Sequence, residues 1–361
     1  MKHQHLYIII MAGGIGSRFW PMSRQQYPKQ FHDILGRGRT LIQETFDRFA
    51  AFVPRENIYF VINDRYDTLV HQQIPGISPD QVLLEPVGRN TAPCVAYAVY
   101  KITQRDPEAV FVVAPADHLI AFEEIFRENI ERGVHACSAH DMIMTLGIKP
   151  TRPDTGYGYI QYIEDQTENG YFKVKTFTEK PNLEVAQSFL DSGDFVWNAG
   201  IFLFSAPVIL RAFDRYLPDM AELFGGIAES YYTPGEQAAI AETYAVCKNI
   251  SIDYGIMEKA DNVYVIPSDF GWSDLGTWGS VYENSVHDTH DNATYCKSLI
   301  FDAANNIVRT DNPDKVVILK GIKDFIIVDT HDALLICRKD DEQFIKHIVS
   351  ELKAQWDDRY V

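Results

Sequence analysis

The chain has 361 residues, of which 46% are hydrophobic and 23% charged, and its formal net charge is −17. These values are typical of a globular protein with one large domain or two unequal ones, and the acidic balance argues against nucleic-acid binding, which needs a basic face. The N-terminal apolar run is too short for a signal peptide or a membrane span, so no membrane association is expected.

The first predicted element is a buried strand at residues 6–11, and a loop at residues 12–31 follows it directly. This loop holds three glycines and three cations but no acid, because the first acidic residue is Asp33; the glycines are Gly13, Gly14 and Gly16, and the cations are Arg18, Arg24 and Lys29. Glycine lets backbone N–H groups approach a ligand closely, and such N–H groups bind anions. The loop therefore predicts a polyphosphate site.

Two common nucleotide-binding motifs are excluded. The dinucleotide fingerprint needs a third glycine where Phe19 stands, which disfavours a nicotinamide dehydrogenase. A Walker loop needs Gly-Lys-Ser/Thr, which does not occur in the sequence. Pro21 and Pro28 instead keep most of the loop extended.

Predicted strands and helices alternate through the first half of the chain. The strands are at 57–62, 110–114 and 142–148, and the helices at 44–52, 95–105 and 122–139. The alternation predicts an α/β fold with a doubly wound, mostly parallel sheet, whose ligand lies beyond the carboxyl ends of the strands. The loop at 12–31 and Asp117 both follow strands, so we expect both at that edge.

The second half continues this pattern and then changes. Strands are predicted at 173–178, 200–204 and 263–267, with helices at 183–190, 207–217 and 235–248. Beyond residue 291 come short strands at 297–302, 306–309, 316–319, 325–329 and 333–338, and a last helix at 341–355. We expect a large domain at 1–290 and a small β-rich C-terminal domain at 291–361.

Further polar residues are candidates for a site. Asp117 could cap a helix, and Asp274 could belong to an ordinary turn, but a pair of carboxylates at a phosphate site also suits Mg²⁺. Glu85, Asn90 and Thr91 follow a strand and could read a purine edge. Guanine needs an acceptor for its N–H groups, and either Glu85 or a backbone carbonyl could supply it.

The loop at 12–31 resembles the signature loop of the sugar-1-phosphate nucleotidyltransferases, and specifically of the mannose-1-phosphate guanylyltransferases. Further matches follow in order: Leu-Glu-Pro-Val-Gly-Arg-Asn-Thr-Ala-Pro at 84–93, Ala-Pro-Ala-Asp-His at 114–118, Phe-Thr-Glu-Lys-Pro at 177–181, Trp-Asn-Ala-Gly-Ile-Phe at 197–202 and Gly-Trp-Ser-Asp-Leu-Gly-Thr-Trp at 271–278. The resemblance implies a Rossmann-like nucleotidyltransferase sheet. It also implies that the enzyme makes GDP-mannose and pyrophosphate from GTP and mannose 1-phosphate with Mg²⁺.

The resemblance also implies residue roles. Lys29 would meet the α-phosphate, Arg18 the β- and γ-phosphates, with Arg24 a weaker candidate, and the glycines, Glu85, Asn90 and Thr91 would bind the nucleotide. The sugar phosphate would be bound by Gly156, Glu179, Lys180 and Asn198, and the metal by Asp117 and Asp274. Because the attacking group is already a phosphate anion, no protein nucleophile and no covalent intermediate are expected.

Two alternatives remain open: a guanylyltransferase for another sugar 1-phosphate, such as a heptose or fucose derivative, and a non-catalytic regulator that binds a nucleotide sugar. The second alternative is disfavoured, because the residues expected to carry catalysis are all present: Lys29, Asp117 and Asp274. The chain ends soon after its β-rich tail, so the isomerase domain of longer family members is expected to be absent, and by resemblance the tail could mediate a homodimer. Five scattered cysteines without a C-x-x-C pair (Cys94, Cys137, Cys247, Cys296 and Cys337) favour a reducing compartment, the cytoplasm.

Overall fold

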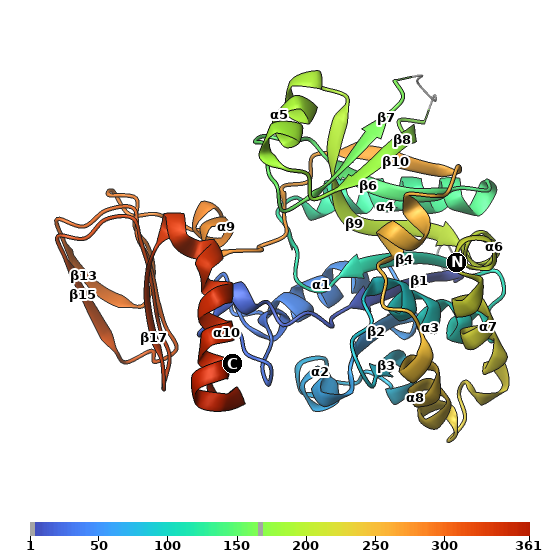
Figure 1. The fold of residues 1–361 in the computed structure, drawn as a ribbon, viewed down its shortest axis with the longest axis horizontal. Coiled ribbons are helices and arrows are strands. Elements are labelled where there is room, and N and C mark those ends of the chain that lie inside the picture. The colour runs from blue at the N-terminus through green and yellow to red at the C-terminus, as the bar shows by residue number, and fades with distance from the viewer. Residues whose placement is uncertain (1–3, 165–168) are drawn as a thin grey trace. The chain divides into compact units, whose positions relative to one another are not determined.

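The computed structural model describes residues 4–164 and 169–361. The chain divides into two units, each labelled by its elements in Figure 1. Unit 1 contains the chain up to Gly13, Phe46–Ala116 and Ile120–Trp272, and unit 2 contains Gly14–Thr45, Asp117–Leu119 and Ser273–Val361. Unit 2 therefore combines the segment after the first strand with the C-terminal part of the chain. The domain boundary at residue 290 stays a prediction.

Unit 1 is built on a nine-stranded sheet with the order β3-β2-β1-β4-β9-β6-β10-β8-β7. The strands are β1 (Leu6–Met11), β2 (Ile58–Asn63), β3 (Val82–Glu85), β4 (Val110–Pro115), β6 (Ile143–Ile148), β7 (Gly158–Tyr162), β8 (Phe172–Glu179), β9 (Phe195–Ser205) and β10 (Val263–Ser268). Pairs among β1–β4, and the pair β6–β10, are parallel. Strand β9 is antiparallel to both β4 and β6, and β8 is antiparallel to β10, so the sheet is mixed.

Helices cover both faces of this sheet, which confirms the doubly wound arrangement. They are α1 (Leu41–Ala50), α2 (Asp67–Gln73), α3 (Thr91–Thr103), α4 (Glu123–Ala139), α5 (Leu183–Ser192), α6 (Ala206–Tyr216), α7 (Pro218–Gly226) and α8 (Glu236–Val246). Ile9 and Val61 belong to one buried cluster with α3, α6 and α7. Successive strand residues point to opposite faces, and on the other face Phe60 packs on Phe46 with ring centroids 5.9 Å apart.

In unit 1 the predicted elements lie close to their observed positions, with several additions. Helices α2 and α7 and strand β7 are among the additions, and the only residue predicted near the start of β7 is Gly156, as part of the sugar-phosphate site. Because β1 to β4 run parallel, their carboxyl ends share one edge of the sheet. Strand β3 ends there at Glu85, and Gly13 comes shortly after β1.

The C-terminal part of unit 2 consists mostly of short strands. They are β12 (Ala293–Tyr295), β13 (Lys297–Phe301), β14 (Ile307–Thr310), β15 (Val316–Lys320), β16 (Phe325–Asp329) and β17 (Leu334–Arg338), with helices α9 (Trp278–Glu283) and α10 (Ile345–Trp356). Strands β12, β14 and β16 are parallel neighbours in one sheet, which β17 closes in the antiparallel sense, and β13 pairs with β15 in another. This confirms the predicted β-rich domain and its terminal helix.

The core of unit 2 joins residues from both ends of the sequence. Phe19 and Trp20, from the loop after β1, belong to the same buried cluster as Ile326, Val328 and Ile345. The loop is thus packed on the C-terminal strands and helix. Within the described residues, no helix has both the length and the apolar character needed to cross a membrane.

Candidate active site

The loop after β1 folds back on itself within unit 2. The carbonyl oxygen of Ile15 accepts hydrogen bonds from the backbone N–H of Lys29, at 3.2 Å, and from the hydroxyl of Ser23. Gly16 has a φ of +72°, and a Cβ added there would lie 2.6 Å from the Cβ of Lys29. Both the backbone conformation and the packing therefore require glycine at position 16.

Lys29 connects the two predicted metal ligands. Its side chain is 3% exposed, and its Nζ donates to Oδ2 of Asp117 at 2.9 Å and to the backbone oxygen of Asp274 at 2.8 Å. Burial alone would raise the pKa of Asp117, but the charges of Lys29 and His118 hold this pKa below its usual value. Three residues that were predicted from separate motifs are thus brought together in unit 2.

Asp274 lies in a tight turn that fixes the orientation of its carboxylate. Its Oδ1 accepts a hydrogen bond from the backbone N–H of Gly276 at 2.9 Å. The next residue, Leu275, has a φ of +43° and a fully buried side chain. Mg²⁺ binds one or two carboxylates and completes its shell with phosphate oxygens and water. Lys29 holds the carboxylate of Asp117 and the backbone oxygen of Asp274 on one ammonium group. The two aspartates fit such an ion in residue type and number.

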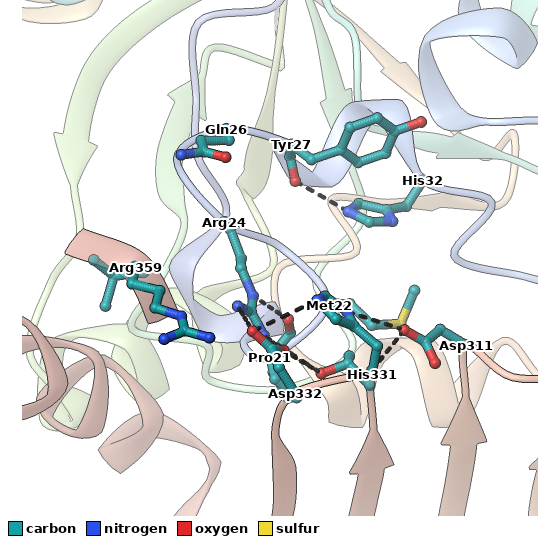
Figure 2. Close-up of a pocket in the computed structure, with 12 residues that line it drawn as sticks. Pro21, Met22, Arg24, Gln26, Tyr27, His32, Asp311, His331, Asp332 and Arg359 are labelled. Carbon is teal, nitrogen blue, oxygen red and sulfur yellow. Dashed lines mark hydrogen bonds and ion pairs between the residues drawn. The ribbon is translucent and has the colours of Figure 1, made fainter. Parts of the chain in front are cut away.

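The two arginines of the loop have different surroundings. Arg18 donates from Nε to Oε1 of Gln343 at 2.9 Å. Arg24 donates from both terminal nitrogens to the carboxylate of Asp332, at 2.8 and 2.6 Å, as Figure 2 shows. The guanidinium of Arg24 is thus bound by a protein carboxylate, whereas phosphate binding by Arg18 stays a prediction.

The predicted nucleotide-binding residues of unit 1 include a buried carboxyl group. Glu85 is 5% exposed, and its Oε1 accepts a hydrogen bond from the hydroxyl of Tyr244 at 2.9 Å. Burial raises the pKa of Glu85 to about 7, against the smaller lowering by that hydrogen bond. A Cβ added at Gly13 would lie 3.5 Å from Oε2 of Glu85. The first glycine of the loop and this carboxyl group are therefore neighbours.

Asn90 and Thr91 make local structural contacts. The Oδ1 of Asn90 accepts the backbone N–H of Thr91 at the start of α3, at 2.9 Å. The Oγ1 of Thr91 accepts the backbone N–H of Ile252, also at 2.9 Å. These contacts fix the start of α3 and the segment near Ile252. That either side chain contacts the nucleotide stays a prediction.

The predicted sugar-binding residues lie on or next to β7, β8 and β9. Gly158 is paired with Glu179 across β7 and β8, and a Cβ added at Gly158 would lie 2.2 Å from Oε1 of Glu179. The other oxygen of Glu179 accepts a hydrogen bond from Nζ of Lys180 at 3.0 Å. The Glu179 side chain is 10% exposed and that of Lys180 is 65% exposed. The backbone N–H of Gly156 donates to Oδ1 of Asp154 at 2.8 Å.

Asn198, on β9, has a fixed amide orientation. Its Oδ1 accepts the backbone N–H of Gly200 at 3.0 Å, and its Nδ2 donates to Oδ1 of Asp253 at 2.9 Å. Burial and the charge of Glu179 raise the pKa of Asp253 to about 6. Asp253 was not predicted as a site residue, because its only signal in the sequence is an acidic residue in an otherwise apolar segment near Ser251.

A cluster of aromatic side chains was also missed. Tyr157 stands between Gly156 and Gly158 in the sequence, and its ring lies 5.0 Å from that of Trp197 and 5.2 Å from that of Trp272, both edge-on. Aromatic rings present flat apolar faces, which suit the C–H faces of a sugar ring. The signal that could have found this cluster was a tyrosine between two glycines.

Most of the chain matches two known protein families. Residues 7–291 match the nucleotidyl transferase family, and residues 297–352 match the family described as a mannose-phosphate isomerase/GMP-like β-helix domain. The chain is similar to the mannose-1-phosphate guanylyltransferase of Escherichia coli K12, with 36% identity over 98% of this chain and 75% of the relative. It is 38% identical to the enzyme of that name from Salmonella montevideo, over 96% of this chain and 74% of the relative.

A solved structure resembles the chain over nearly all its length. It comes from Thermus thermophilus, is titled a mannose-1-phosphate geranyltransferase, and has 31% identity and a TM-score of 0.87 over 97% of this chain and all of that one. The resemblance drawn from the sequence motifs is therefore confirmed. The chain belongs to the nucleotidyltransferase family and, within it, to the mannose-1-phosphate guanylyltransferases.

Proposed function

We propose that this protein transfers GMP from GTP to mannose 1-phosphate and releases pyrophosphate. Its family membership supports the reaction class and the substrates. The observation that carries the proposal is the buried ammonium group of Lys29, held between Asp117 and Asp274. A buried lysine flanked by two oxygen-rich residues is suited to bind phosphate beside a divalent ion.

In this reaction an oxygen of the sugar phosphate attacks the α-phosphorus of GTP in line. The bond from that phosphorus to the bridging oxygen of the β-phosphate breaks, and pyrophosphate leaves with the electron pair. The attacking oxygen is already anionic, so no protein base or nucleophile is required. The protein instead brings two mutually repelling anions together and stabilises the charge that develops between them.

Lys29 and Arg18 are the proposed catalytic cations. Two of the three N–H donors of Lys29 are engaged by Asp117 and Asp274, which fixes the direction of the ammonium group. In this proposal the ammonium binds the α-phosphate, and the planar fork of Arg18 binds the β- and γ-phosphates. Asp117 and Asp274 would hold Mg²⁺, which when bound neutralises phosphate charge and polarises the phosphoryl oxygens.

Glu85 is the proposed acceptor for guanine. The N1–H and N2–H₂ groups of guanine are donors, and a buried carboxylate oxygen is a strong partner for them. The position of Glu85 at the end of β3, near Gly13, supports this assignment. Asn90 and Thr91 would act mainly by fixing the backbone that follows Glu85.

The sugar phosphate is assigned to the second group of residues in unit 1. Glu179 and Asn198 would bind sugar hydroxyls, Lys180 the phosphate, and the backbone at Gly156 would approach the ring closely. The exposure of the Lys180 side chain and the burial of Glu179 support these separate roles.

The experiment is a substrate panel measured by pyrophosphate release and by identification of the nucleotide sugar. GTP should be preferred to ATP by about 10⁴-fold in kcat/KM, because adenine leaves the buried polar groups of a guanine site unpaired. Mannose 1-phosphate should be preferred to the heptose and fucose 1-phosphates. Equal rates with ATP and GTP, or a preference for another sugar, would reassign the substrate, and nucleotide-sugar binding without turnover would support the regulator.

Cellular location and assembly belong to the same proposal. All five cysteines are free thiols, which supports a reducing compartment such as the cytoplasm. A homodimer through the β-rich part of unit 2 stays a prediction. A measurement of the molecular mass of the protein in solution would test it.

A further inference from the structure

The ion pair between Arg24 and Asp332 joins the loop at residues 12–31 to the turn between β16 and β17 within unit 2. We infer that Arg24 is a positioning residue: together with Asp332 it holds the turn at residues 24–27 in place and thereby fixes the ammonium group of Lys29. This inference rests on the proposed function, because it needs Lys29 to act on phosphate. It also removes Arg24 from the set of phosphate ligands.

The geometry of the pair is that of a fixed structural contact. Nη1 of Arg24 donates to Oδ2 of Asp332 at 2.8 Å, and Nη2 donates to Oδ1 at 2.6 Å, so the two planar groups meet in a bidentate arrangement. The side chains are only 13% and 19% exposed. Hydrogen bonds from Arg24 hold the pKa of Asp332 below its usual value. Removal of either side chain would leave the other as a largely buried charge without its partner, which destabilises the folded protein.

Asp332 is itself held in a tight turn. The backbone N–H of Thr330 donates to the carbonyl oxygen of Ala333 at 2.8 Å, and Oγ1 of Thr330 donates to Oδ1 of Asp332 at 3.2 Å. Oγ1 of Thr330 also accepts a weak hydrogen bond from Nη2 of Arg24 at 3.4 Å. The carboxylate is therefore oriented by its own turn between β16 and β17.

Arg24 acts at the centre of the loop. Its backbone N–H and carbonyl pair with the carbonyl and N–H of Tyr27, at 3.2 and 3.1 Å, which closes the turn two residues before Lys29. Its Nε donates to the carbonyl oxygen of Pro21 at 3.0 Å. One guanidinium group thus binds the segment before the turn and the C-terminal strands at the same time.

Other contacts hold the chain on either side of this turn. The indole N–H of Trp20 donates to the carbonyl oxygen of Tyr360 at 2.6 Å, and the guanidinium of Arg309 donates to the carbonyl oxygens of Asp33 and Ile34. The loop is anchored before and after the turn, and the Arg24–Asp332 pair anchors the turn itself. Arg24 and Asp332 line a cavity of about 470 Å³. Asp311 and His331 line it as well, as Figure 2 shows.

A mutant cycle separates positioning from direct phosphate binding. R24A and D332A should each lower kcat by about 10- to 100-fold, the effect expected when a catalytic group is misplaced by roughly 1 Å. The KM values for GTP and mannose 1-phosphate should stay within about twofold. The R24A/D332A double variant should be no slower than the slower single variant. In a K29A background, R24A and D332A should cause no further loss, because both act through Lys29.

The matched control is D311N. Asp311 lines the same cavity, and its carboxylate accepts the backbone N–H of His331 at 2.9 Å. This variant should keep the kcat of the wild type. A charge exchange, R24D/D332R, should be faster than R24D or D332R alone. If the alanine variants melt below the assay temperature, R24K and D332N replace them. R24K keeps the positive charge, D332N keeps the shape of the side chain, and both remove the bidentate ion pair.

Several results would overturn the inference. They are an unchanged kcat in D332A or in D332N, an increase in the KM for GTP in R24A but not in D332A, and multiplicative losses in the K29A background. The last two would make Arg24 a phosphate ligand. A wild-type protein that forms no GDP-mannose would instead refute the proposed function, whatever the variants do.

Discussion

Gly16 and Lys29 pack so closely that even one methyl group at position 16 has no room. An added Cβ would lie 2.6 Å from the Cβ of Lys29 and 3.2 Å from its Cδ. Gly16 therefore has a packing role that does not depend on any ligand, because its missing side chain leaves room for the aliphatic part of Lys29. The spacing of the glycine and the lysine in the motif thus has a steric explanation.

We expect G16A to lower kcat by about 10²-fold, because Lys29 must move and the backbone is strained at a positive φ. Steady-state kinetics with both substrates would measure this effect. G226A is the control, since a Cβ at Gly226 meets no atom within 4 Å and the residue is far from the loop in sequence. A G16A enzyme with the turnover of the wild type would show that the position of Lys29 is not critical.

The two lysines predicted to bind phosphate should differ in their kinetics. K29A should mainly lower kcat, because the contact to the α-phosphate strengthens as charge develops. K180A should chiefly raise the KM for mannose 1-phosphate and leave the KM for GTP nearly unchanged, because a contact made equally in the ground and transition states affects only binding. Initial rates with each substrate varied in turn would test this, and the opposite pattern would mean that the two roles are exchanged.

Removal of divalent ions should abolish activity. EDTA should stop pyrophosphate release and excess Mg²⁺ should restore it, because the carboxylates of Asp117 and Asp274 would otherwise face the phosphates without a cation between them. D117A and D274A should each lose about 10²-fold or more in kcat. Full activity in the presence of the chelator would contradict the magnesium assignment.

Glu85 should make stability depend on pH. Burial raises its pKa from 4.5 to about 7. A raised pKa means that the folded state binds the proton more tightly, so this contribution to the unfolding free energy is complete below pH 4.5 and is lost as the pH rises through 7. The shift corresponds to roughly 3 kcal/mol. Between about pH 5 and 8, the melting temperature of the wild type should fall relative to that of E85Q, and parallel curves would refute this.

Asp253 should affect sugar binding through the amide of Asn198. D253A should raise the KM for mannose 1-phosphate about tenfold, because the orienting acceptor is lost, and should leave the KM for GTP unchanged. D253N keeps an amide oxygen that can accept from Nδ2 of Asn198, so its KM should lie closer to that of the wild type. Equal defects in both variants would indicate that the charge of Asp253 matters, and no defect in either would exclude its role.

Most strands and helices could be predicted because each depends on a local pattern. The sequences of buried strands are short apolar runs, and those of the helices have apolar residues at helical spacing. The partner and direction of a strand are not local properties. Strand β9 is apolar like its neighbours, and nothing in its own residues indicates that it is antiparallel to both β4 and β6. The mixed sheet was therefore beyond sequence reasoning.

The same limit applies to the candidate site. Lys29, Asp117 and Asp274 could be found because each belongs to a motif with its own chemical signature. Asp253 and Asp332 could not, because each acquires its role from one partner, 55 and 308 residues away in sequence. An isolated aspartate in a sequence is indistinguishable from an ordinary surface acid.

The composition of unit 2 has a consequence for biosynthesis. Phe19 and Trp20 leave the ribosome about three hundred residues before Ile326 and Ile345, with which they share a core. The loop that carries Lys29 therefore lacks its final packing partners during the time in which the sheet of unit 1 is translated. A nascent chain would reach catalytic competence only after β16, β17 and α10 had emerged, so a stalled or prematurely terminated polypeptide should be unable to consume GTP.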